Sequence, residues 1–172
     1  RQGRHDPGRT ELRKTLAISP SFAYARYNLG VALLEQGRFD DAVSQFSQAV
    51  RYRPGYAKAY YNMGLAYAAK GQTDQATAAF RKATALNPSY VEAHNNLGVA
   101  ALSGRNYTEA ANHFRKAIEV DPDFAEGHKN LAYTYWLLGE RASAKRELGK
   151  LKSLNREMWK GLQRLLSQSA EE

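Results

Sequence analysis

Small and apolar residues recur along this chain at a period of 34 residues. Five separate positions keep this spacing over three or four repeats, and a fixed period of 20–50 residues indicates a repeat protein. The five series are Pro20, Pro54, Pro88 and Pro122; Gly30, Gly64 and Gly98; Ala42, Ala76, Ala110 and Ala144; Phe46, Phe80 and Phe114; and Ala49, Ala83 and Ala117.

Each repeat predicts two helices. In the first repeat, Leu29, Ala32 and Leu33 stand at helical spacing and predict a helix from Phe22 to about Gln36, which Gly37 ends.

The second helix of this repeat runs from about Asp40 to about Arg53, before Pro54. An acidic residue suits its start, where backbone N–H groups lack partners, and proline cannot continue its interior.

Helix packing explains the small residues. Larger side chains at Gly30 and Ala42 would hold the two helices apart, and Phe46 fills the space beside them.

The second repeat resembles the tetratricopeptide repeat, whose pattern is W-x-x-L-G-x-x-Y…A-x-x-x-F…P over 34 residues. The resemblance implies an all-α fold, a right-handed solenoid of helix hairpins with an extended concave binding groove. Arg26, His94 and His128 depart from the family at a position where it favours a large aromatic residue. The matching residues are Tyr60, Met63, Gly64, Tyr67, Ala76, Phe80 and Pro88.

The period also divides the chain. We expect four repeats at about 23–56, 57–90, 91–124 and 125–156, then a capping helix over 156–168 and a tail over 169–172. Residues 2–6 align with residues 36–40, so 1–20 would be the second helix of a truncated preceding repeat. This pattern favours a fragment of a longer protein, and a native half-repeat that caps the array is the alternative. Exposed Leu12 and Leu16 would then permit self-association.

The composition excludes several kinds of site. The chain has no cysteine, so it has no disulfide, thiolate metal site or cysteine nucleophile. The net charge is +8, yet residues 15–140 carry twelve basic and eleven acidic residues, so the excess lies at the two ends. A basic patch is expected at Arg141, Lys145, Arg146, Lys150 and Lys152. A solvated helix face is the simpler interpretation of that patch, and phosphate or an anionic surface is the functional one.

The resemblance implies that the first helix of each hairpin lines the concave groove. We therefore predict that a partner contacts the residues of these helices that point away from the second helices. They are Tyr24, Tyr27, Asn28, Val31, Lys58, Tyr61, Asn62, Leu65, Asn95, Asn96, Val99, Lys129, Asn130 and Tyr133.

Two features of this set carry the binding hypothesis. Asn28, Asn62, Asn96 and Asn130 place one amide in every repeat, which we call the asparagine series. An amide both donates and accepts, so it suits a peptide backbone, but it would equally tie neighbouring helices together. The tyrosines are amphipathic residues of the kind that anchor interfaces.

The family's carboxylate clamp, which uses lysine, arginine and asparagine in this groove, fits poorly. The matching positions hold Tyr27, Val31, Asn62, Glu92 and Asn96, of which only Asn62 fits.

Catalysis is not expected. His94 and His128 repeat one position without metal-ligand spacing, and there is no nucleophile elbow or phosphate-binding loop.

The leading interpretation is a protein-interaction scaffold that holds a partner peptide or helix. The alternatives are a substrate-recruiting segment of a larger enzyme, which the asparagine series suggests by its similarity to O-GlcNAc transferases, and a less favoured nucleic-acid-binding protein. We expect no cofactor, metal or small-molecule substrate. The many alanines and arginines favour a bacterial source, with cytoplasmic, periplasmic and membrane-attached locations all open.

Overall fold

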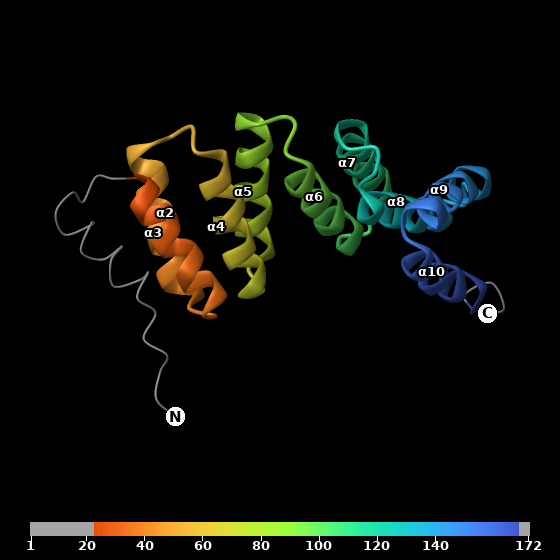
Figure 1. Cartoon of the computed structure of the whole chain (residues 1–172), viewed down its shortest axis with the longest axis horizontal. Coiled ribbons are helices and arrows are strands. Elements are labelled where there is room, and N and C mark those ends of the chain that lie inside the picture. Colours follow the sequence, from red (N-terminus) through yellow and green to blue (C-terminus); the bar gives the residue numbers. More distant parts are fainter. Residues whose placement is uncertain (1–22, 169–172) are drawn as a thin grey trace, which may run out of the picture. The chain divides into compact units, whose positions relative to one another are not determined.

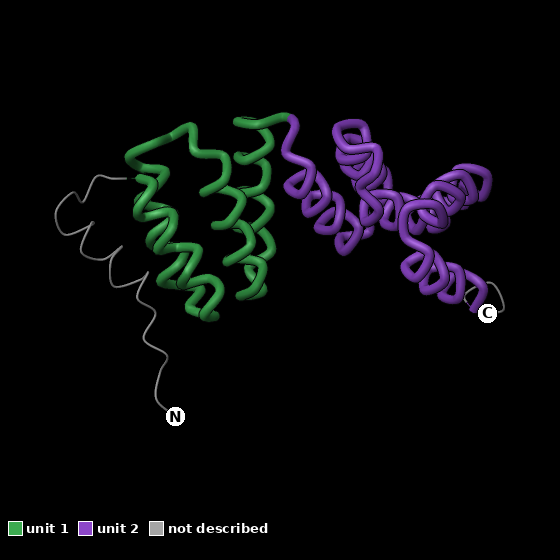
Figure 2. The backbone as a smooth tube through the Cα atoms, viewed as in Figure 1, with its two compact units in different colours: residues 1–88 green, residues 89–172 purple. Residues whose placement is uncertain are grey.

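The computed structural model describes residues 23–168, and within them every regular element is a helix, nine in all. The chain divides into unit 1, residues 1–88, and unit 2, residues 89–172 (Figure 2), and Figure 1 labels the helices of both units. The half-repeat predicted for 1–20 and the tail over 169–172 lie outside the described residues. The helices are α2 (Ala23–Glu35), α3 (Phe39–Tyr52), α4 (Ala57–Ala69) and α5 (Thr73–Leu86) in unit 1, and α6 (Val91–Ser103), α7 (Tyr107–Val120), α8 (Ala125–Leu137), α9 (Arg141–Leu154) and α10 (Arg156–Gln168) in unit 2.

A residue in the left-handed backbone conformation follows the first helix of each of the four hairpins. Gly37, Gly71 and Gly139 have φ of 73°, 73° and 78°, and the next N–H bonds back to a carbonyl five residues earlier. This is the Schellman arrangement, which favours glycine. The third hairpin places Arg105 there, at φ 59°, because its glycine stands one residue earlier at Gly104.

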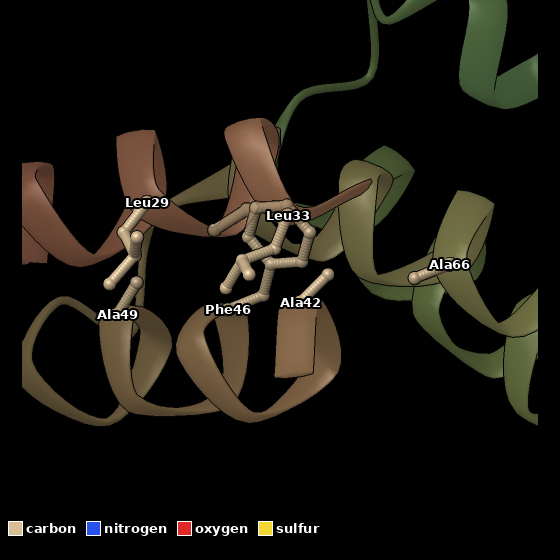
Figure 3. Packing of buried hydrophobic residues seen from close by; sticks show 7 residues of the cluster. Leu29, Leu33, Ala42, Phe46, Ala49 and Ala66 are labelled. Atoms are coloured by element: carbon tan, nitrogen blue, oxygen red, sulfur yellow. The ribbon is translucent and has the colours of Figure 1, made fainter. Parts of the chain in front are cut away.

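A contact between a glycine and a phenylalanine ring closes the first three hairpins. A Cβ on Gly30 would lie 2.6 Å from the Phe46 ring. A Cβ on Gly64 would lie 2.5 Å from the Phe80 ring, and a Cβ on Gly98 would lie 2.5 Å from the Phe114 ring. Figure 3 shows Phe46 between the two helices, beside Leu33 and Ala42. The ring therefore occupies the volume of the missing side chain, which confirms the packing reason for the small residue at this position.

The fourth hairpin solves the same packing problem differently. Ala132 stands in the glycine series and Leu148 in the phenylalanine series, and they pack together with Leu151. A methyl group fits on the first helix here because no aromatic ring faces it. The replacement of glycine by alanine thus accompanies the replacement of phenylalanine by leucine.

The capping helix α10 covers this fourth hairpin. Leu162 and Leu166 of α10 join the buried cluster of Ala132 and Leu151, and Trp159 packs against it. The helix begins after a single linking residue, Asn155, whose side chain accepts a hydrogen bond from the Met158 N–H at 3.0 Å.

We predict that Gly98→Ala destabilises the chain, by on the order of 1 kcal/mol. The added methyl group displaces the Phe114 ring, and overpacking of this kind costs more than the roughly 1 kcal/mol that alanine gains over glycine in a helix. Gly149→Ala in α9 is the matched control, because no atom lies within 4 Å of its added Cβ. Urea unfolding should show opposite signs for the two variants, and equal stabilisation would contradict the packing account.

Candidate partner-binding surface

In unit 1, the predicted groove residues lie on α2 and α4 and differ in exposure. Tyr24 is 56% exposed and Lys58 is also exposed. The rings of Tyr27 and Tyr61 instead pack towards Phe46 and Phe80, with ring centroids 6.0 and 5.7 Å apart. These tyrosines therefore connect the hairpin core to the groove side of the first helices. The half-buried residues of the set are Tyr27, Asn28, Val31, Tyr61, Asn62 and Leu65.

In unit 2, the predicted residues lie on α6 and α8. Val99 is 41% exposed and Asn95 is buried, 7% exposed. Asn96, Lys129, Asn130 and Tyr133 are half-buried. Each unit therefore presents its own first-helix surface, formed by two neighbouring helices.

The amides of Asn62 and Asn130 link neighbouring first helices. Asn62 Nδ2 donates to the Tyr27 hydroxyl at 2.9 Å, and Asn130 Nδ2 donates to Asn95 Oδ1 at 2.9 Å. In both pairs the sixth residue of one first helix bonds to the fifth residue of the preceding one. This geometry supports the structural interpretation of these two residues, and each amide has further capacity for hydrogen bonds.

A hollow lies between α8 and α10, where the predicted groove residues meet the capping helix. Its volume is about 370 Å³ and its lining is mostly apolar. We call it the α8–α10 hollow. Sequence reasoning assigned α10 only a covering role and missed this site. The lining residues are Lys129, Asn130, Tyr133, Met158, Gly161, Leu162 and Leu165.

The five residues of the predicted basic patch spread around the exposed side of α9. Their spacing places Arg141, Lys145 and Lys152 on one edge and Arg146 and Lys150 on the other.

Most of these five cations contact groups of the same chain. Arg141 lies over the Trp136 ring at 4.6 Å and Lys152 over the Trp159 ring at 4.9 Å. Lys150 pairs with Asp123 at 3.1 Å. These contacts support the solvated-face interpretation.

Sequence comparison places the repeats in a known family. Tetratricopeptide repeat models match residues 11–44, 32–71, 61–123 and 101–166, which together span most of the chain. The chain belongs to the tetratricopeptide repeat family. No curated protein matches its sequence.

Solved tetratricopeptide structures share the fold. MamA is 24% identical with a TM-score of 0.79, covering 91% of this chain and 98% of its own. PilF of Pseudomonas aeruginosa is 21% identical with a TM-score of 0.80, covering 90% and 72%. YrrB, described as a tetratricopeptide protein with an unusual peptide-binding site, is 23% identical with a TM-score of 0.73, covering 95% and 81%. These likenesses confirm the predicted all-α solenoid class.

The histidines of this tetratricopeptide chain serve packing. His128 Nδ1 lies 2.8 Å from Glu147 and its Nε2 lies 3.0 Å from the Pro122 carbonyl, so the ring joins α8, α9 and the preceding loop. The rings of His94 and His113 lie 5.8 Å apart. Across residues 23–168, no three histidine or acidic side chains gather closely enough to hold a metal ion. Over the same range, no helix is long and apolar enough to cross a membrane.

Tyr27 makes the folding stability of unit 1 depend on pH. Burial raises the pKa of its hydroxyl, while the hydrogen bond from Asn62 opposes this shift. The folded-state pKa therefore exceeds the unfolded-state pKa of about 10. The unfolded chain loses this proton first as pH rises, so the contribution of Tyr27 to stability is constant below about pH 10 and falls above it.

We predict that Tyr27→Phe reduces this alkaline loss. At neutral pH the same change costs about 1 kcal/mol, because the Asn62 amide loses its acceptor. Tyr52→Phe is the matched control at a 47% exposed tyrosine and should change neutral stability by less than about 0.5 kcal/mol. Urea unfolding between pH 7 and pH 11 measures both effects. Identical alkaline profiles for Tyr27→Phe and the unmodified chain would contradict the burial argument.

Proposed function

We propose that this chain is a non-enzymatic scaffold that binds a segment of a protein partner on the first-helix surface of its units. The observation that carries the proposal is the exposure of large side chains there. Tyr24 is 56% exposed and Val99 is 41% exposed, although both stand on helices whose other faces are buried. Aromatic and apolar side chains with this exposure provide binding area that the hairpin core does not use.

Backbone-directed polar groups accompany these side chains. Asn62 and Asn130 hold neighbouring first helices at a fixed spacing through their Nδ2 donors. Such a spacing suits an extended peptide, and the remaining amide N–H and carbonyl of each residue suit its backbone groups. Asn62 and Asn130 therefore serve both alignment of the helices and contact with a partner.

Two structural neighbours support this kind of ligand. YrrB is described as having a peptide-binding site, and the first tetratricopeptide domain of Spaghetti (RPAP3) was solved with the HSP90 peptide SRMEEVD. The latter is 23% identical with a TM-score of 0.65, covering 68% of this chain and 93% of its own. The clamp residues expected for an acidic tail are mostly lacking here, so the scaffold takes a different peptide.

We predict that a photo-crosslinking residue at Val99 captures the partner, whereas the same residue at Glu119, exposed on the second helix α7, does not. The captured partner is then identified and titrated against the purified chain.

Val99→Ala should weaken this partner about fivefold, because one interface anchor of roughly 1 kcal/mol is removed. Asn112→Ala on α7 is the control and should leave affinity unchanged. Equal affinity of the Val99→Ala variant and the unmodified chain would refute the first-helix surface of unit 2 as the binding site.

A further inference from the structure

The α8–α10 hollow lies at the place where the asparagine series stops. Asparagine is the sixth residue of α2, α4, α6 and α8, at Asn28, Asn62, Asn96 and Asn130. The sixth residue of α10 is Gly161, which lines the hollow and is exposed. A Cβ at Gly161 would meet no atom within 4 Å. The side chain that links first helices elsewhere is thus absent here, and its space is open.

The residue opposite this gap has also changed in chemistry. Tyr27 and Asn95, the fifth residues of α2 and α6, accept the amide hydrogen bonds of the following helices. The fifth residue of α8 is Lys129, whose ammonium group donates and cannot accept. A group that fills this gap must therefore offer an acceptor, and an anion suits it best.

Among residues 23–168, Lys129 makes a single ion pair, which is weak. Its Nζ lies 3.0 Å from Glu126 on the same helix, with the two side chains 31% and 50% exposed. An exposed pair of this spacing is worth about 0.5 kcal/mol, so an incoming carboxylate can replace it. Arg164 follows Gly161 by three residues on the same side of α10 and forms no ion pair within the described part of the chain. Among the residues that line the hollow, Lys129 alone carries a charge.

The rest of the hollow is apolar. Met158, Leu162 and Leu165 line it from α10, and Tyr133 lines it from α8. A volume of about 370 Å³ lies at the small end of the range for ligand pockets, and suits one or two side chains rather than a folded element. Methionine adds adaptable packing for the occupant.

We propose that the α8–α10 hollow is a specificity subsite for a partner peptide in which a side-chain carboxylate stands next to a bulky aliphatic residue. The aliphatic side chain enters between Met158 and Leu165, and the carboxylate pairs with the Lys129 ammonium. This subsite rests on the proposed function and adds the sequence preference that a backbone-directed asparagine series lacks.

The test uses three tetrapeptides as probes and the full chain. They are acetyl-Ser-Glu-Leu-Ser-amide, its Gln-Leu analogue without the charge and its Glu-Ala analogue without the bulk. Binding is followed through the Gly161 amide and the Leu165 methyl resonances in NMR titrations. We predict that the Glu-Leu peptide shifts both sets of resonances and binds about threefold or more tightly than either analogue, as one exposed ion pair or a few buried methylenes give.

Two variants locate the effect. Gly161→Asn refills the hollow and should abolish binding of the Glu-Leu peptide, whereas Gly149→Asn, the same change on exposed α9, should leave it unchanged. Lys129→Gln should remove the preference for Glu-Leu over Gln-Leu. Thermal unfolding of each variant verifies the fold. Undisturbed Gly161 and Leu165 resonances, or equal binding by the Gly161→Asn variant, would overturn the subsite.

The outcomes for the crosslinked partner separate the subsite from the proposed function. If Val99→Ala weakens that partner while Gly161→Asn does not, the scaffold function stands and the subsite is wrong. If neither change weakens it, both are wrong. If both changes weaken it, the partner also contacts α10, as the subsite requires.

Discussion

The contact between a helix glycine and an aromatic ring determines how closely the two helices approach in each of the first three hairpins. The ring of Phe46, Phe80 or Phe114 takes the volume where a Cβ would stand. Because the ring lies so near the backbone, it fixes the rotation of the first helix, and other sides of that helix carry the exposed residues. Hairpin packing and the binding surface are thus two sides of one helix, and a change in the contact would alter the presentation of Tyr24 or Val99.

The stacking of hairpins depends on a second, polar interaction. Asn62 and Asn130 donate to residues 35 positions earlier, so each amide joins the first helix of one repeat to that of its predecessor within a unit. At α10 the series stops at Gly161, and the α8–α10 hollow results. The absence of an asparagine at Gly161 leaves this hollow open. Its chemistry differs from that of the other helix pairs, because Lys129 is a hydrogen-bond donor where Tyr27 and Asn95 are acceptors.

Much of the fold could be predicted, because the period of 34 residues repeats the same physical requirements. The helices from α2 to α10, the glycine contact and the capping helix all follow from spacing and residue size. Residues that depart from the repeat were harder to interpret. Arg105 takes a left-handed turn position because its glycine is displaced by one residue, and His128 pairs with Glu147 across helices that no sequence pattern connects. The α8–α10 hollow lies where α10, which only Asn155 joins to α9, meets α8, and no pattern in the sequence indicates a hollow there.

The central claim is that the glycine and the ring share one volume, and a double-mutant cycle tests it most directly. Phe114→Leu alone leaves a cavity, and Gly98→Ala alone overpacks the ring. Their combination copies the pair Ala132 and Leu148 of the fourth hairpin. We predict that the free energy of unfolding of the double variant is at least about 1 kcal/mol higher than the value obtained by adding the effects of the two single changes. Strict additivity of the two changes would contradict the account.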